Sequence, residues 1–240
     1  MNFNQRVKKY VPKRLRDLRP YKADSAPNLI KLDAMELPFP LGDDVLDDFY
    51  RLVRTVPLNR YPDSKSKELR RRFLSANRLS DSVDVILGNG SDELIHMLCL
   101  LMSRSEDSAM LCPGPTFSVY RIAAETVGLR YLEVDTSPEN FDFCTERVVE
   151  VASESSPALI FIASPNNPTG NSISEPELEN VCRSTQGLVI LDEAYWRFSG
   201  RSLISLVESF ENLLVLQTLS KVGFAGLRIG MLFGQKPWID

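Results

Sequence analysis

The feature that most constrains the fold of this chain is a series of seven short apolar runs separated by amphipathic stretches. The runs cover residues 83–87, 109–112, 130–134, 158–163, 188–191, 213–216 and 227–233. Several are apolar on successive residues, as in Leu-Ile-Phe-Ile at 159–162, a pattern typical of strands that are covered on both faces. We therefore predict an α/β fold, a three-layer domain with a mostly parallel seven-stranded sheet.

The stretches between the runs have the apolar spacing of helices. The helices are expected at residues 91–103, 117–127, 145–152 and 175–184. The last of them starts with a capping box, because Ser174 is followed three residues later by Glu177. A helix after each strand is the connection that a parallel sheet requires.

The chain is expected to divide into an arm and one large domain. Residues 1–45 are predicted to be an N-terminal arm and connector that belongs to a small domain, and residues 46–240 to be the large, ligand-binding domain. The arm is basic over residues 6–22, where Pro12 and Pro20 should interrupt any helix. We expect this stretch to be solvated and not to bind nucleic acid.

Composition narrows the function classes. A chain of 240 residues with 43% hydrophobic residues can bury a core, and a net charge of −4 gives no reason to expect nucleic acid or a membrane as partner. The four cysteines form no Cys-x-x-Cys pair, so neither a metal site nor a disulfide is expected. With no long apolar run and no secretory signal, a cytoplasmic protein acting on a small soluble substrate is expected.

Polar residues gather where the predicted strands end, which is where ligands bind in open parallel sheets. The segment 88–93 reads Gly-Asn-Gly-Ser-Asp-Glu and leads into a helix, so its backbone N–H groups suit a phosphate, although such turns are also common without one. Phe117 is expected either above the strand ends or in the core. The turn at 164–170, with Asn166 and Asn167, is either a structural turn or a source of hydrogen-bond donors.

Two later strand ends supply the groups for a reaction. Asp192 directly follows a buried run and needs a partner, because an unpaired buried carboxylate is costly. Ser220 and Lys221 follow the next run, with Arg228 seven residues beyond the lysine, and a single lysine is usually a surface residue. Together they match Schiff-base chemistry: a lysine of lowered pKa can bind an aldehyde cofactor, and an aspartate can keep a pyridine nitrogen protonated.

These segments, taken as a set, resemble the fold-type I pyridoxal-phosphate enzymes of aminotransferase class I/II. The motifs are Asn-Pro-Thr-Gly at 167–170, Asp-Glu-Ala-Tyr at 192–195, Ser-Lys at 220–221 and Gly-Leu-Arg-Ile-Gly at 226–230. Within this family, the segments 32–36, 59–63 and 88–93 most resemble the histidinol-phosphate aminotransferases. The resemblance runs from about residue 30 to the last residue.

The resemblance implies pyridoxal 5'-phosphate as the cofactor and assigns a role to each site residue. Lys221 would bind it covalently and move the substrate proton, and Asp192 would pair with the ring nitrogen. Asn167 and Tyr195 would bind the phenolic oxygen of the ring, and Phe117 would stack on its face. Lys221, Asp192 and Tyr195 form the expected catalytic group. The phosphate would be held by four residues: Ser91, Asp92, Ser220 and Arg228.

The implied reaction transfers an amino group between L-glutamate and imidazole acetol phosphate, giving histidinol phosphate in histidine biosynthesis. Tyr61 matches a tyrosine that relatives lend to the phosphate of the neighbouring subunit, which implies a homodimer. Two other functions stay open: an aminotransferase for aromatic or other phosphorylated substrates, and an inactive cofactor-binding remnant.

The sequence departs from the family pattern at two places. Leu37 stands where many relatives have asparagine. Relatives also continue well past residue 240, with most of a small domain and the arginines that grip the substrate. A truncated form, with the C-terminal small domain largely missing, is therefore expected.

Overall fold

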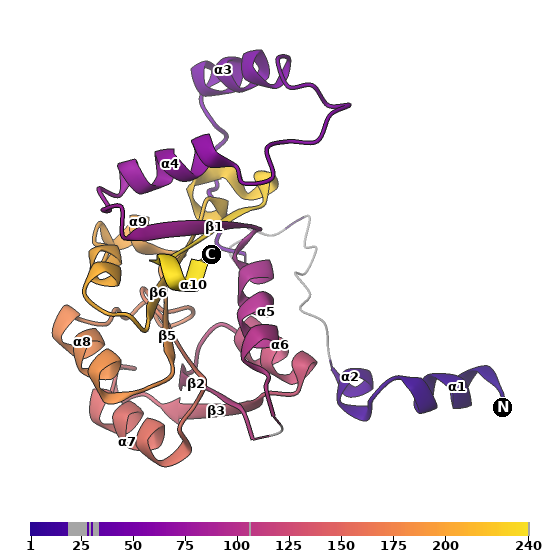
Figure 1. Ribbon diagram of the computed structural model, residues 1–240, viewed down its shortest axis with the longest axis vertical. Helices are drawn as coiled ribbons and strands as arrows, with labels where there is room; N and C mark the ends of the chain where they lie inside the picture. The colour runs from indigo at the N-terminus through magenta and orange to yellow at the C-terminus, as the bar shows by residue number, and fades with distance from the viewer. Residues whose placement is uncertain (19–27, 29, 31–33, 106, 240) are drawn as a thin grey trace.

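The computed structural model describes residues 1–18, 28, 30, 34–105 and 107–239. Within them seven strands form one sheet, in the order β1-β7-β6-β5-β4-β2-β3 (Figure 1). The strands are β1 (Val83–Asn89), β2 (Ala109–Gly114), β3 (Arg130–Asp135), β4 (Leu159–Ala163), β5 (Leu188–Asp192), β6 (Leu213–Thr218) and β7 (Ile229–Gln235). Only β7 runs antiparallel to its neighbours, so the prediction of a mostly parallel seven-stranded sheet is confirmed.

Helices cover both faces of the sheet and produce the three layers. On one face lie α5 (Ser91–Met102) and α6 (Val119–Val127), and on the other α4 (Lys67–Ala76), α7 (Thr145–Ser155) and α8 (Glu175–Ser184) (Figure 1). Strand β4 shows why its apolar residues are consecutive. Ile160 and Ile162 pack into one core and Leu159 and Phe161 into the other, and all four are buried.

The helix predictions differ from the structure mainly at the ends. Helix α8 has the predicted capping box, in which Ser174 and Glu177 each accept from the other's backbone N–H. Helix α7 continues to Ser155, and α6 begins at Val119 rather than at Phe117. Helix α4 was not predicted, because its sequence is largely charged and only Phe73 and Leu74 reach the core.

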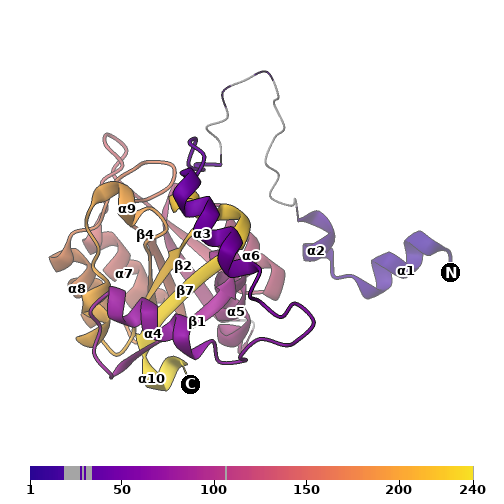
Figure 2. The same ribbon diagram turned by 90° about the horizontal axis from the view of Figure 1, so that it is seen from above.

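The remaining helices lie at the edges. At the N-terminal side are α1 (Phe3–Tyr10), α2 (Lys13–Asp17) and α3 (Asp43–Val53), of which α1 and α2 are separated at Pro12, as predicted (Figure 2). The short ones are α9 (Trp196–Ser199), α10 (Lys236–Ile239), two 3₁₀ turns (Ile204–Glu208 and Ala225–Leu227) and a π turn (Ser220–Phe224). Among the described helices, none is long and apolar enough to cross a bilayer.

Some of the predicted segments lie outside the described residues. These are residues 19–27, 29 and 31–33 of the arm, which include Leu32 and Asp33 of the 32–36 motif, and Asp240.

The direction of β7 brings its first residues to the edge where the parallel strands end. Asn89 at the end of β1 pairs with Ile229, and Thr218 at the end of β6 pairs with Gly230. The prediction that residues 227–233 are one strand is wrong at its start. Arg228 has a left-handed backbone, with φ of 52°, so the extended strand begins only at Ile229. The left-handed residue turns the arginine toward the edge of the sheet.

Candidate active site

A cavity of about 190 Å³ opens at this edge of the sheet. One water needs only about 10–15 Å³, so the space suits a small molecule. Nine of the ten site residues predicted from the sequence line it: Ser91, Asp92, Phe117, Asn167, Asp192, Tyr195, Ser220, Lys221 and Arg228. The tenth, Tyr61, does not line the cavity and is fully exposed.

Asp192 ends β5 on the floor of the cavity and is buried. Its Oδ2 accepts from the Tyr120 hydroxyl at 2.6 Å, and its Oδ1 from the Ala194 N–H at 2.9 Å. Burial raises the pKa of this carboxyl to about 6, although both hydrogen bonds lower it. Because neither partner carries a charge, this carboxylate would be stabilised by a cation placed in the cavity.

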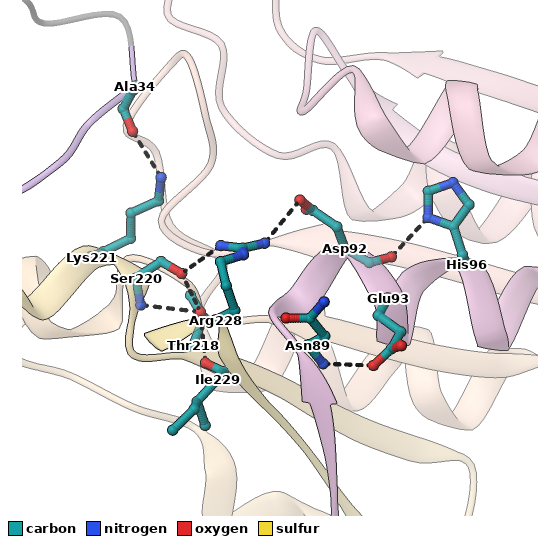
Figure 3. Close-up of polar contacts among 10 residues, drawn as sticks. All are labelled: Ala34, Asn89, Asp92, Glu93, His96, Thr218, Ser220, Lys221, Arg228 and Ile229. Atoms are coloured by element: carbon teal, nitrogen blue, oxygen red, sulfur yellow. Dashed lines mark hydrogen bonds and ion pairs between the residues drawn. The ribbon is translucent and has the colours of Figure 1, made fainter. Parts of the chain in front are cut away.

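Lys221 follows β6 in the π turn and is half-buried. Its Nζ donates to the Ala34 carbonyl oxygen at 2.9 Å (Figure 3). The same Nζ lies 5.4 Å from the centre of the Tyr195 ring. Burial lowers the pKa of the Lys221 amine, and Arg228 adds to this, against the opposing charges of Asp92, Glu36 and Asp192. An amine with a lowered pKa is a better nucleophile at neutral pH.

Another part of the cavity lining combines a helix start with an arginine. Ser91 and Asp92 form the first turn of α5, where backbone N–H groups have no partner inside the helix. Arg228 reaches this turn, with Nη2 at 3.7 Å from Asp92 Oδ2 and Nη1 at 3.5 Å from Ser220 Oγ (Figure 3). The Thr218 hydroxyl accepts from the Ser220 N–H at 3.2 Å and so fixes the turn after β6. A helix start beside an arginine suits a phosphate group.

Two glycines allow these segments to approach. Gly90 has φ of +83°, and a Cβ there would lie 2.4 Å from the Arg228 guanidinium. A Cβ on Gly230 would lie 2.5–2.6 Å from backbone atoms of Gly90 and Ser91, which cannot rotate away.

We therefore expect Gly230→Ala to lower the free energy of unfolding by about 1–3 kcal/mol, the usual cost of overpacking. It should also weaken phosphate binding, because the first turn of α5 must shift. Urea unfolding and a phosphate titration measure the two effects. Gly226→Ala is the matched control, since a Cβ there meets nothing within 4 Å and should change neither quantity. Equal effects of the two substitutions would contradict the close approach.

The remaining predicted residues lie around the mouth of the cavity. The Asn167 amide donates to the Tyr195 hydroxyl at 3.4 Å, so the two polar groups lie together. The Phe117 ring meets the Tyr120 ring edge-on, with centroids 5.6 Å apart. Leu37 lies against Gly223, two residues after Lys221.

Among the polar residues that line the cavity, sequence reasoning missed Tyr120, Glu36 and Thr218. Tyr120 lies three residues after Phe117, and in the helix predicted at 117–127 this spacing would have placed both side chains on one face. Glu36 was recognised only as part of a motif. Thr218 ends β6, two residues past the apolar run predicted at 213–216.

The groups around the cavity fit one kind of ligand. A buried carboxylate suits a ring nitrogen that carries a proton, a half-buried amine suits an aldehyde, and the arginine beside the helix start suits a phosphate. With the three-layer sheet, this is the structure of a fold-type I pyridoxal-phosphate enzyme. The chain belongs to the aminotransferase class I and II family, whose model matches residues 27–240.

Relatives support this assignment and the predicted resemblance. Histidinol-phosphate aminotransferase 2 of Nitrosococcus oceani is 41% identical over 234 residues, which are 98% of this chain and 64% of the relative. The histidinol-phosphate aminotransferase of Neisseria meningitidis is 40% identical over 217 residues, 88% of this chain and 58% of the relative. The chain thus spans about three fifths of the length of these relatives.

Solved structures share the fold. The histidinol-phosphate aminotransferase of Sinorhizobium meliloti, in complex with pyridoxal-5'-phosphate, matches with a TM-score of 0.73 at 22% identity, covering 84% of this chain and 55% of that one. A protein of Erwinia carotovora, described as a putative histidinol-phosphate aminotransferase, matches with a TM-score of 0.76 at 24% identity, covering 90% and 64%. At these identities the likeness concerns the fold alone.

Proposed function

We propose that this chain binds pyridoxal 5'-phosphate in the cavity and acts as an aminotransferase on histidinol phosphate. The observation that carries the proposal is the placement of the Lys221 amine and the buried Asp192 carboxylate on one cavity. Family membership and the likeness to histidinol-phosphate aminotransferases support the cofactor and the substrate class.

Each residue then has a task that follows from its place. Lys221 attaches the cofactor through its amine and afterwards takes and returns the proton of the substrate Cα. Asp192 holds a proton on the ring nitrogen. When bound, the cofactor supplies an electron-withdrawing ring that stabilises negative charge at the substrate Cα. Asn167 and Tyr195 bind the phenolic oxygen, and Phe117 lies on the ring face.

The phosphate of the cofactor is held at the start of α5. The backbone N–H groups of Ser91 and Asp92, the Ser220 hydroxyl and the Arg228 guanidinium would bind it. Tyr61, which is fully exposed here, reaches the phosphate of a second copy in a homodimer. In this proposal residues 46–240 form the cofactor-binding domain, residues 1–45 the arm of a small domain, and the protein works in the cytoplasm.

The substrate is tested by coupled assays. With imidazole acetol phosphate as acceptor and L-glutamate as donor, or with histidinol phosphate and 2-oxoglutarate in reverse, turnover is expected. Turnover of phenylalanine alone would refute the substrate and favour an aromatic aminotransferase. The second candidate is an inactive protein that binds the cofactor. It predicts an absorbance band from bound cofactor without turnover of any donor.

Arg228→Ala is expected to weaken binding of pyridoxal 5'-phosphate by roughly 10- to 100-fold, the worth of a hydrogen bond between charged groups. It should leave binding of pyridoxal, which has no phosphate, nearly unchanged. Both affinities can be measured by absorbance titration. Arg147→Ala, which removes an exposed arginine from α7, is the control and should alter neither. An equal loss for both ligands would show that Arg228 does not act on the phosphate.

A further inference from the structure

Tyr120 is a buried core residue of a helix, but its hydroxyl makes a hydrogen bond in the candidate active site. It lies on α6, only 1% exposed, and its ring packs on Phe161 with centroids 4.9 Å apart. Its hydroxyl leaves this apolar packing and donates to Asp192 Oδ2 at 2.6 Å. A buried hydroxyl needs a partner, and here the partner is the one carboxylate that faces the ring nitrogen in the proposed function.

The two oxygens of Asp192 are therefore held from different elements. Oδ1 accepts from the Ala194 N–H on the loop after β5, and Oδ2 accepts from α6. Two donors at opposite oxygens leave the carboxylate little freedom to rotate. They also favour its charged form, since each donor stabilises the negative charge.

The surroundings otherwise oppose this charge. The carboxylate is buried, and the acidic groups that act on it are Asp92 from α5 and Glu193 from the loop after β5. Two cationic groups, Lys221 after β6 and Arg228, line the same cavity, and Lys221 interacts with the charge of Asp192. Without the Tyr120 hydroxyl, the Ala194 N–H would be the one hydrogen bond left to stabilise the charge against burial and two acidic neighbours.

We propose that Tyr120 is a positioning residue, whose hydroxyl orients the Asp192 carboxylate and keeps it ionised toward the ring nitrogen of the cofactor. The role toward the cofactor rests on the proposed function, whereas the effect on Asp192 belongs to the protein alone. An ionised carboxylate accepts a hydrogen bond from a protonated ring nitrogen. A neutral carboxyl would donate to the ring instead, and the ring would lose its positive charge.

Core packing is the competing explanation of Tyr120. Phenylalanine separates the two, because Tyr120→Phe keeps the ring against Phe161 and Phe117 and removes only the hydroxyl. Tyr131→Phe is the matched control. Tyr131 is a partly buried tyrosine on β3 that packs against the same core and makes no contact with Asp192.

The test is an NMR titration of the unloaded protein, labelled with ¹³C at the aspartate carboxyl carbons. The Asp192 signal is assigned by its loss in Asp192→Asn. In the wild type its midpoint is expected near pH 6. In Tyr120→Phe the midpoint should rise by roughly one to two pH units, the worth of a hydrogen bond to a charged group, and in Tyr131→Phe it should not move. A midpoint in Tyr120→Phe equal to that of the wild type would overturn the proposal.

A second variant keeps the test decisive if Tyr120→Phe does not fold. Difluorotyrosine introduced at position 120 retains the ring and the hydroxyl but donates more strongly, so the Asp192 midpoint should fall. An unchanged midpoint would again overturn the proposal. Cofactor binding is measured on the same samples: wild type that titrates as expected but binds no pyridoxal 5'-phosphate would defeat the proposed function and leave the link between Tyr120 and Asp192 standing.

Discussion

Lys221→Ala should abolish covalent attachment of pyridoxal 5'-phosphate and lower the rate of transamination by about 10²–10⁴-fold, the contribution of a positioned general base. The amine is half-buried with a lowered pKa, and it lines the same cavity as Asp192. Borohydride reduction followed by intact mass measurement checks the attachment. The wild type should gain the mass of one reduced cofactor, and the variant none.

Lys236→Ala is the control for this experiment. Lys236 begins α10 after the end of β7, away from the cavity lining, and its loss should leave labelling and turnover unchanged. Peptide mapping completes the test. A cofactor found on another lysine in the wild type, or on Lys221→Ala at the wild-type level, would contradict the assignment.

Asp192→Asn should raise the free energy of unfolding of the unloaded protein at neutral pH. It should also remove the stabilisation that this carboxylate gains when the cofactor binds. Burial raises the pKa of Asp192 from 3.8 to about 6, so the folded protein binds this proton more tightly than the unfolded chain does. The stability that the protonated group contributes is therefore complete below about pH 4 and lost as the pH rises through 6. A shift of about two units corresponds to about 3 kcal/mol, which the neutral amide should recover above pH 6.

Urea unfolding of both proteins at several pH values measures this effect. The difference between variant and wild type should be small near pH 4 and grow to its full size above pH 6. Adding pyridoxal 5'-phosphate should then reverse the order, because the ring nitrogen gives the wild-type carboxylate a cation and the amide has no charge to pair with it. Asp135→Asn, at the exposed end of β3, serves as the control. A variant less stable than the wild type at pH 8 would refute the account of Asp192.

The sheet could be predicted because strands covered on both faces must be apolar at successive positions. Residues 159–162 and 188–191 show this pattern, and all are buried. The candidate site could be predicted because each strand delivers the residue that follows it to the same edge. The positions of β5 and β6 along the chain were enough to predict that Asp192 and Lys221 lie near each other.

Other features depend on tertiary structure that local sequence does not carry. An apolar run has no direction, so the reversal of β7 and the left-handed turn at Arg228 were not predicted. Tyr120 has the pattern of a core residue, and its partner lies 72 residues further along the chain. The contact exists only because α6 docks on the sheet above the end of β5.

A crystal structure of the protein loaded with pyridoxal 5'-phosphate tests the central claim most directly. Continuous density is expected between Lys221 Nζ and the cofactor, with the Asp192 carboxylate at hydrogen-bonding distance from the ring nitrogen, about 2.6–3.2 Å, and the phosphate at the start of α5. A cofactor that is joined to another residue, or whose ring nitrogen points away from Asp192, would contradict the account.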